Sequence, residues 1–153
     1  MKESVYIESS VISYCTSRTS RDLIVAARQA ITLEWWESKL TQYDAYVSPV
    51  VEREISAGDR DAARKRIRLI LEIPSLRVTE ESQKLADGLL AAQLLPPGSV
   101  DDALHIALAS AHGMDYLLTW NFKHINNAET KSKIFYFYKK PGISVQYCAH
   151  QKN

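Results

Sequence analysis

The chain has 153 residues, the length of one domain with a sizeable single core, and its 19 Lys and Arg residues nearly balance its 18 Asp and Glu residues. The formal net charge of +1 excludes a strong overall attraction to nucleic acid, so affinity for RNA would have to come from local patches. No apolar stretch approaches the ~20 residues of a membrane span and the N-terminal segment lacks a signal-peptide core, so we expect a soluble, cytoplasmic protein without membrane contact.

Taken in chain order, the first half of the sequence predicts two strands and two helices. A short β-branched and aromatic run at 5–7 predicts a strand, and apolar residues spaced three or four apart over 21–40 predict a helix. The buried face of this helix is expected to carry Leu23, Ala27, Ala30, Ile31 and Trp35. Residues 45–48 predict a second strand, closed by Ser48 as the N-cap of a short helix with Pro49 at its first position.

The second half of the sequence continues this alternation. Helices are predicted at 59–72, 79–95 and 99–112. Strands are predicted at 75–78 and 115–121, and residues 143–148 are a candidate for a last strand. Alternating strands and helices favour an α/β fold, namely a three-layer α/β/α sandwich with a mainly parallel central sheet of four or five strands. No linker or internal repeat divides the chain, so we expect residues 1–153 to form a single domain.

Polar residues that follow the predicted strands are candidates for a functional site, because ligands of parallel sheets bind beyond the carboxyl ends of the strands. Glu8 follows the first strand, Asn121 ends the strand predicted at 115–121, and Glu54 lies on the short helix after the second strand. On a helical wheel Glu54 falls on the apolar arc, where a carboxylate is costly to bury unless it is paired or metal-bound. A neighbouring basic residue such as Arg53 is the alternative partner.

The helix predicted at 99–112 begins with two further acids, Asp101 and Asp102. A capping box between Ser99 and Asp102, together with the helix dipole, would explain acids in this turn without any function. The turns that follow are apolar nearly all round, which favours a buried helix whose acidic start lies at the same crevice. The helical wheel does not choose between Asp101 and Asp102.

Two aromatic side chains near these acids have both a functional and a structural interpretation. His105 lies four residues after Asp101 and either braces it or is simply packed and hydrogen-bonded, which is the commoner role of a single helical histidine. Trp120, next to Asn121, either stacks an unpaired base of a single-stranded nucleic acid or packs at the end of its strand.

Three segments carry a resemblance to a known family: "VYIESSVISY", "YVSPVVEREISAGD" and "DDALHIALASAHGMDYLLTWNFKHI". In this order they resemble the PIN-domain ribonucleases, most closely the VapC-type toxins of toxin-antitoxin pairs. The resemblance covers residues 4–127, and the segment 128–153 does not follow the family pattern. It implies a PIN-like fold and a divalent-metal-dependent endoribonuclease that acts on RNA, is silenced by a cognate antitoxin protein and forms a homodimer.

The resemblance also implies which residues hold the Mg²⁺ or Mn²⁺ ion. The four metal-binding positions of the family fall on Glu8, Glu54, Asp102 and Asn121, with Asp101 as an assisting ligand. Ser9 falls where a small hydroxyl residue supports the first acid, and Thr119 matches the threonine that precedes the last position. The amide of Asn121 replaces an acid, so it can ligate through its carbonyl oxygen but adds no charge and would hold a second ion less firmly.

The sequence leaves three functions open. Metal ions can polarise a phosphodiester, activate water and stabilise the leaving oxygen, so the resemblance implies hydrolysis that leaves a 5′-phosphate. The change at Asn121 and the atypical segment after residue 127 favour, as an alternative, a catalytically weakened PIN-like domain that serves as a nucleic-acid-binding or regulatory module. A metal phosphoesterase that acts on small molecules is the third interpretation.

Overall fold

The centre of the computed structural model, which describes residues 2–121 and 144–146, is a parallel sheet. Its four strands are β1 (Ser4–Ile7), β2 (Asp44–Tyr46), β3 (Tyr116–Leu118) and β4 (Ser144–Gln146), in the spatial order β2-β1-β3-β4. All pairings between these strands are parallel. The predicted parallel sheet is therefore confirmed, including a last strand within 143–148.

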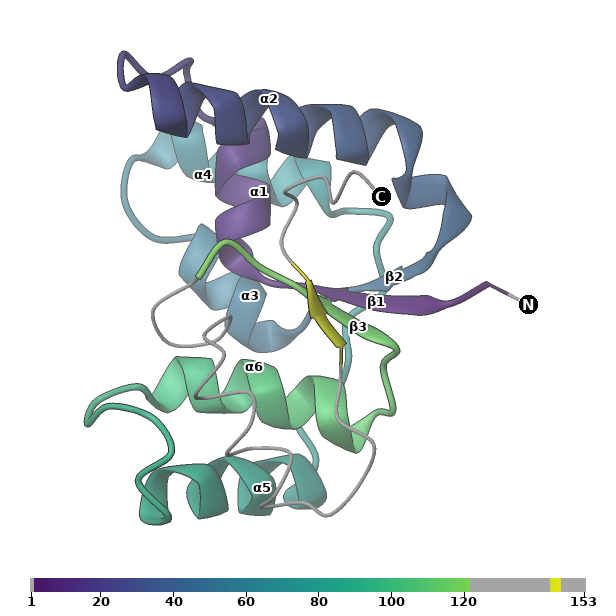
Figure 1. The fold of residues 1–153 in the computed structure, drawn as a ribbon, viewed down its shortest axis with the longest axis vertical. Coiled ribbons are helices and arrows are strands. Elements are labelled where there is room, and N and C mark those ends of the chain that lie inside the picture. Colours follow the sequence, from purple (N-terminus) through teal and green to yellow (C-terminus); the bar gives the residue numbers. More distant parts are fainter. Residues whose placement is uncertain (1, 122–143, 147–153) are drawn as a thin grey trace.

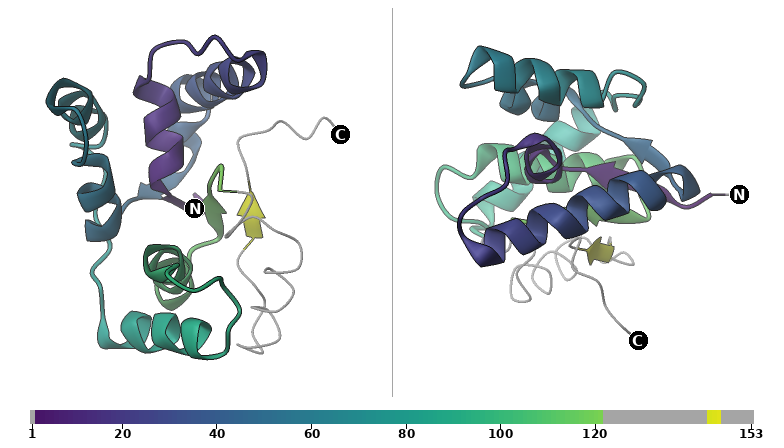
Figure 2. Two further views of the ribbon diagram at one scale, coloured as in Figure 1. Left: turned by 90° about the vertical axis from the view of Figure 1, so that its left-hand side faces the viewer. Right: turned by 90° about the horizontal axis from the view of Figure 1, so that it is seen from above.

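Helices cover the sheet in two layers. The described helices are α1 (Ser9–Thr16), α2 (Leu23–Ser38), α3 (Pro49–Ile55), α4 (Arg60–Leu69), α5 (Glu80–Ala91) and α6 (Val100–Ala111), with a short 3-10 helix, η1 (Leu40–Gln42), after α2. Figure 1 shows α1, α2 and α4 on one side of the sheet and α5 and α6 on the other, and the turned views in Figure 2 show the same layers. The predicted three-layer α/β/α sandwich is confirmed. Among the described helices, none combines the length and the apolar character needed to cross a membrane.

The strand order brings three strand ends to one edge of the sheet. β1 is paired with β2 on one side and with β3 on the other, and Ile7 is in register with Leu118. The chain runs from β1 outward to β2 and later returns to the opposite side of β1 to form β3, so the strand order reverses beside β1. Such a reversal opens a crevice at the carboxyl ends of the strands. The residues that follow β1, β2 and β3 therefore meet at this edge.

The core is centred on β1, β3 and the helix α6, with further buried residues from α1, α3 and α5. In β1, Tyr6 and Ile7 are fully buried, and in β3 Leu117 and Leu118 are buried beside them. Every residue of α6 from Ala103 to Ala109 is buried. Burial on all sides explains why the sequence of α6 is apolar nearly all round, and it fixes the acidic first turn of this helix close to the sheet.

Residues 9–16 form a helix, α1, that the sequence pattern did not indicate. Its N-cap is Glu8, whose side chain accepts hydrogen bonds from the backbone N–H of Ser10. Glutamate is not among the residues that usually cap helices, so the normal start signal is missing from the sequence. The consequence is that Glu8 is the single residue between β1 and α1, and this position fixes its backbone from both sides.

The strand predicted at 75–78 is wrong. Ser75 makes only an isolated bridge to Val47, supported by a hydrogen bond from the Val47 N–H to the Pro74 carbonyl and one from the Leu76 N–H to the Val47 carbonyl. The neighbouring segment turns into α3 directly after Val47, so no backbone continues alongside residues 76–78 to complete a strand pair.

The predicted N-cap of α3 is confirmed. The Ser48 hydroxyl accepts a hydrogen bond from the Val51 N–H at 3.3 Å, and Pro49 occupies the first turn. Apart from β4, the segment 128–153, which the resemblance left unassigned, lies outside the described residues.

The predicted buried face of α2 is only partly correct. Ile31 and Trp35 are half-buried against the core, but Leu23, Ala27 and Ala30 are exposed, and the buried residue of this helix is Thr32. The Thr32 hydroxyl accepts a hydrogen bond from the indole N–H of Trp120 at 2.8 Å. A buried polar side chain such as Thr32 is one that an apolar spacing rule does not find.

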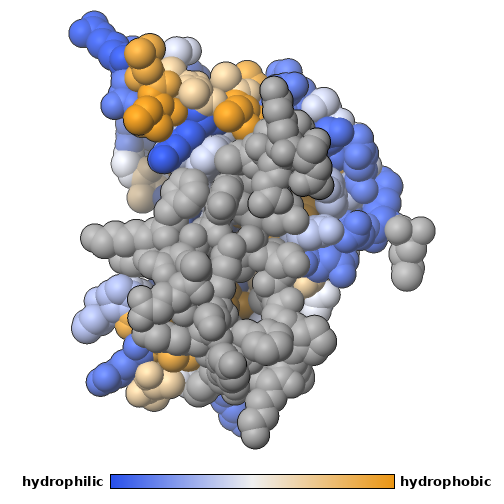
Figure 3. All heavy atoms as spheres, in the orientation of Figure 1, coloured by the Kyte–Doolittle hydropathy of each residue, from blue (hydrophilic) through white to orange (hydrophobic). Residues whose placement is uncertain are grey.

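The outer face of α2 instead exposes large apolar side chains. Leu23 is 86 % exposed, Ile24 is 67 % exposed and Leu33 is 42 % exposed. Figure 3 shows apolar side chains gathered over this helix. Large exposed apolar side chains of this kind occur on surfaces that contact another molecule.

Candidate metal centre

Glu8 is a buried carboxylate held by uncharged donors. Its side chain is 5 % exposed and accepts hydrogen bonds from the backbone N–H of Ser10 at 3.2 Å, from the Ser10 hydroxyl, and from the Thr119 hydroxyl at 2.7 Å. Thr119 comes from the end of β3, one position beyond the pair Ile7–Leu118. These donors orient the carboxylate at the crevice between β1 and β3 without neutralising its charge.

Glu54 reaches the same crevice from α3. The helix buries Val50, Val51 and Ile55, and the arc between them carries Glu54, as the helical wheel predicted. Its Oε1 atom accepts a hydrogen bond from the Ser9 hydroxyl at 2.7 Å and contacts the Nε2 atom of His105 at 2.5 Å. Because Ser9 donates to Glu54, the expectation that it supports the first acid is wrong, and Ser10 and Thr119 take that role.

The environment of Glu54 favours its charged form. Burial raises the pKa of Glu54, but the hydrogen bond and charge of His105, the hydrogen bond of Ser9 and the charge of Arg53 together lower the pKa below the ordinary value of 4.5. Arg53 forms its ion pair with Asp101 and not with Glu54, so the alternative in which Arg53 is the partner of Glu54 is wrong.

His105 is fully buried and hydrogen-bonded at both ring nitrogens. Its Nδ1 atom lies 2.6 Å from the hydroxyl of Tyr6, which in turn lies 2.8 Å from the hydroxyl of Ser48. Burial lowers the pKa of His105, but the hydrogen bond with Glu54 and the nearby negative charges raise it overall above the ordinary value of 6.5. Burial raises the pKa of Tyr6, which keeps this hydroxyl protonated. The packed, hydrogen-bonded interpretation of His105 is correct, and its acidic partner is Glu54.

The acids at the start of α6 have separate partners. Asp101 pairs with Arg53 at the surface, while the carboxylate of Asp102 accepts a hydrogen bond from the Nδ2 atom of Asn121 at 3.1 Å. Ser99 makes no side-chain capping bond, so the expected capping box with Asp102 is not formed. Tertiary contacts therefore distinguish the two aspartates that the helical wheel left equivalent.

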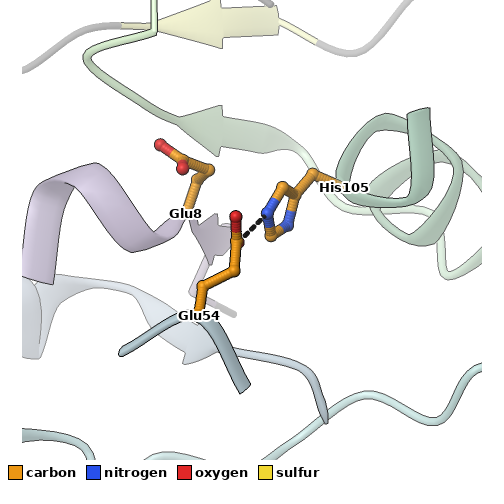
Figure 4. A group of neighbouring side chains, drawn as sticks. All are labelled: Glu8, Glu54 and His105. Carbon is orange, nitrogen blue, oxygen red and sulfur yellow. Dashed lines mark hydrogen bonds and ion pairs between the residues drawn. The ribbon is translucent and has the colours of Figure 1, made fainter. Parts of the chain in front are cut away.

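Three of these side chains bring potential ligand atoms close together. One atom each from Glu8, Glu54 and His105 lies within 4.8 Å of the others, and this is the group with metal-binding spacing among the described residues. Figure 4 shows Glu54 of α3 and His105 of α6 in contact, with Glu8 from the end of β1 beside them. The negative charge of Asp102 also acts on His105, which places Asp102 beside this group but not in it.

Trp120 belongs to the support of the site and does not offer a face to an RNA base. Its side chain is 6 % exposed, its indole bonds to Thr32, and its ring packs edge-on against Tyr14 with the Arg28 guanidinium 5.4 Å from the ring centre. Its backbone N–H donates to the Ser10 hydroxyl at 2.9 Å. Of the two interpretations, strand-end packing is the correct one.

Sequence reasoning missed the roles of Tyr6 and Ser10. Tyr6 lies in the apolar strand β1, where an aromatic residue needs no explanation beyond packing, and its partner His105 is 99 residues away. A tyrosine in a fully buried strand does carry one signal, since its hydroxyl must find a partner inside the core.

The donor chemistry of this group fits a divalent cation. Two carboxylates whose charges are not neutralised by a Lys or Arg contact among the described residues face one crevice, and hard cations such as Mg²⁺ and Mn²⁺ prefer oxygen ligands of this kind. A cation between Glu8 and Glu54 would offset their mutual repulsion.

Comparison with known proteins gives a family for this chain. Curated proteins provided no match to the sequence. The family model described as "PIN domain" matches residues 5–128, which is most of the chain. The match includes β1 from its second residue, β2, β3 and every residue of the candidate centre, and it agrees with the parallel α/β/α fold. PIN domains have a nuclease-type fold and are in general metal-dependent nucleases, and this chain belongs to the PIN domain family.

Proposed function

We propose that this PIN domain is a divalent-metal-dependent endoribonuclease that hydrolyses RNA phosphodiesters. The observation that carries the proposal is the convergence of Glu8 and Glu54, which are distant in sequence and lie at the carboxyl end of the sheet with ligand atoms within 4.8 Å. Glu8 is buried and Glu54 is partly buried and contacted by His105, and two like charges this close are costly, so we propose that a bound cation completes their compensation.

Each acid of the site has a separate role in this proposal. Glu8 and Glu54 bind the Mg²⁺ or Mn²⁺ ion directly. Asp102 lies outside the group with metal-binding spacing, so it assists through water, and Asn121 orients the Asp102 carboxylate through the hydrogen bond at 3.1 Å. Asp101 holds Arg53 at the rim of the site, where a guanidinium can meet a backbone phosphate of the substrate.

The chemistry that a divalent ion supplies here, when bound, is stabilisation of the charge that develops on the phosphodiester during attack by water. The protein holds the ligands rigidly: the Glu8 backbone is fixed by β1 and α1, and its carboxylate is fixed by Ser10 and Thr119. The carboxylate of Glu54 stays ionised because its pKa is lowered, so it is ready to bind a cation at neutral pH.

The proposal includes a biological role as the toxin of a toxin-antitoxin pair. The similarity to VapC-type sequences supports this role, and the exposed apolar side chains of α2 provide a surface for a second protein chain. We propose that this partner is a cognate antitoxin and that the toxin itself is a homodimer. Growth arrest on expression, reversed by coexpression of a short protein encoded next to this chain, would support this role, and normal growth at verified protein levels would contradict it.

The nuclease proposal is tested with the purified full-length protein and a mixed-sequence single-stranded RNA. We expect cleavage that requires Mg²⁺ or Mn²⁺, stops with EDTA and leaves 5′-phosphate ends. Glu54→Gln should lower the rate by at least ~100-fold, beyond the range found when only a supporting residue is changed. Glu52→Gln is the matched control, because Glu52 is an exposed acid on the same helix and should retain activity.

The alternatives give different results in the same assay. A nucleic-acid-binding or regulatory module would bind the RNA without cleaving it in the presence of either metal. A small-molecule phosphoesterase would hydrolyse model phosphate esters but leave RNA intact. Either pattern would overturn the proposal.

A further inference from the structure

A continuous chain of buried polar contacts ends on one oxygen of Glu54. The hydroxyl of Ser48 lies 2.8 Å from that of Tyr6, the Tyr6 hydroxyl lies 2.6 Å from Nδ1 of His105, and Nε2 of His105 lies 2.5 Å from Oε1 of Glu54. The Ser9 hydroxyl donates to the same Oε1 atom at 2.7 Å. The chain thus joins the end of β2, the middle of β1, and α6 to a single carboxylate on α3.

Packing alone does not require these polar groups. Ser48, Tyr6 and His105 have no exposed surface, and burying a hydroxyl or an imidazole is costly unless it is hydrogen-bonded. Apolar residues of similar shape would fill the same space at little cost, because removing both partners of a buried hydrogen bond is often nearly neutral. Hydrogen-bonded side chains differ from apolar ones in that each hydrogen bond fixes the orientation of the groups it joins.

His105 donates a hydrogen bond to Glu54 in both protonation states of the His105 ring that fit the contacts. With a neutral ring, the Tyr6 hydroxyl donates to Nδ1 of His105 and the Nε2–H group donates to Glu54. With a protonated ring, Nδ1–H donates to the Tyr6 oxygen, Tyr6 donates to Ser48, and Nε2–H again donates to Glu54. In each case Oε1 of Glu54 accepts from His105 and Ser9.

The distance between His105 and Glu54 indicates a hydrogen bond and not two ligands on one ion. Neighbouring ligand atoms on an octahedral Mg²⁺, each at about 2.05 Å, would lie about 2.9 Å apart. The Nε2 and Oε1 atoms are 2.5 Å apart, which is closer than such a pair. His105 therefore supports the carboxylate, and the second oxygen, Oε2, is the one that remains to meet a cation.

We propose that His105 and Tyr6 are positioning residues, which hold the Glu54 carboxylate in one orientation so that Oε2 faces the cation beside Glu8. This inference rests on the proposed metal site. Figure 4 shows the His105 ring against Glu54, with Glu8 on the far side of the carboxylate from α3. Partners that orient metal ligands typically change metal affinity by 10- to 100-fold when they are removed.

The experiment measures Mn²⁺ binding to the full-length protein by electron paramagnetic resonance, with no RNA present. We expect His105→Leu to weaken Mn²⁺ affinity by about 10- to 100-fold. Tyr6→Phe should weaken it by about 10-fold, because His105 can still donate to Glu54 but its ring has lost the hydrogen bond with the Tyr6 hydroxyl. His105→Gln, which keeps an N–H donor, should recover part of the loss. His112→Gln is the matched control at the end of the same helix, because the His112 ring contacts the Arg77 carbonyl and not a carboxylate of the site. Thermal unfolding verifies that each variant is folded.

A second readout separates positioning from direct ligation. If His105 only positions Glu54, His105→Leu weakens Mg²⁺, Mn²⁺ and Ni²⁺ by the same factor, and bound Mn²⁺ shows no coupling to an imidazole nitrogen. A ligating imidazole would make the loss greatest for Ni²⁺ and would give nitrogen coupling, and either result would overturn the inference.

The outcomes also separate this inference from the proposed function. Wild-type affinity for Mn²⁺ in a folded Tyr6→Phe variant overturns the positioning role and leaves the nuclease proposal standing. Should His105→Leu fail to fold, Tyr6→Phe still tests the positioning role, since phenylalanine fills the same space in β1. Wild-type protein that binds no Mn²⁺ overturns the metal site itself, and the inference with it.

Discussion

Replacement of Glu8 by glutamine should remove metal binding while leaving the metal-free fold about as stable as before. The amide keeps the shape of the side chain and one acceptor oxygen for Ser10 and Thr119, which surround it. It removes the negative charge that faces Glu54 across the site. Most substitutions of a buried, multiply hydrogen-bonded side chain are costly, so a neutral result would be unusual and informative.

The expected neutrality comes from two opposing effects of similar size. Two unit charges at the outer limit of 4.8 Å repel each other by about 3.5 kcal/mol at an effective dielectric constant of ~20, and the variant relieves this repulsion. The variant also turns three charge-assisted hydrogen bonds, from the Ser10 N–H, the Ser10 hydroxyl and the Thr119 hydroxyl, into neutral ones, at about 1 kcal/mol each. The net change in the metal-free free energy of unfolding should therefore stay within about 1 kcal/mol.

Addition of metal should raise the Tm of wild type but not that of Glu8→Gln. An ion present at 100 times its Kd stabilises the protein that binds it by about 2.7 kcal/mol, which raises the Tm of a chain of this size by about 5–10 °C. Wild type should show this rise on addition of Mn²⁺, and Glu8→Gln should show none. The assay is thermal unfolding after EDTA treatment, with and without Mn²⁺, and Glu52→Gln is the control for loss of one exposed charge. Equal metal-induced rises in wild type and Glu8→Gln would refute Glu8 as a ligand.

The remaining predictions concern three other positions. Asn121→Asp should lower the metal-free Tm, because it replaces the hydrogen bond to Asp102 with a like-charge contact, and should increase the stabilisation by Mg²⁺; a smaller metal effect than in wild type would contradict this. In metal-free protein, the raised pKa of His105 implies stability that is fully present below pH 6.5 and lost as the pH rises through the raised value, and the lowered pKa of Glu54 implies stability that is present above pH 4.5 and lost as the pH falls through the lowered value. The Tm difference between wild type and His105→Gln should thus be largest between these limits and shrink as the pH rises above the raised pKa of His105, and a constant difference would argue against it. Trp120→Phe should cost at least about 1 kcal/mol, through the lost indole hydrogen bond and the smaller ring in a buried position, without changing RNA affinity in a binding assay, and weakened RNA binding by a stable variant would reinstate a base-stacking role.

The sequence by itself determined the alternation of strands and helices. It also indicated that Glu8 follows the first strand and that Glu54 lies among the buried residues of a short helix. The run at 5–7 and the cap at Ser48 are local signals, because a strand and an N-cap each depend on a few neighbouring residues. The helical wheel of residues 49–55 likewise placed Glu54 among buried neighbours, since the spacing along one helix is fixed by its geometry. Local signals failed at α1, where an unusual N-cap hid the start of the helix, and at the inner face of α2, where Thr32 is buried.

Only the tertiary structure decided which polar groups meet. The wheel left Asp101 and Asp102 equivalent, and they differ because Arg53 reaches the first from α3 while Asn121 reaches the second from the end of β3. The pairing of Tyr6 with His105, and of His105 with Glu54, likewise joins residues 99 and 51 positions apart. A side-chain hydrogen bond depends on distances of a few tenths of an ångström between separate elements, and these distances are set by how the helices pack on the sheet, which no periodicity in the sequence encodes.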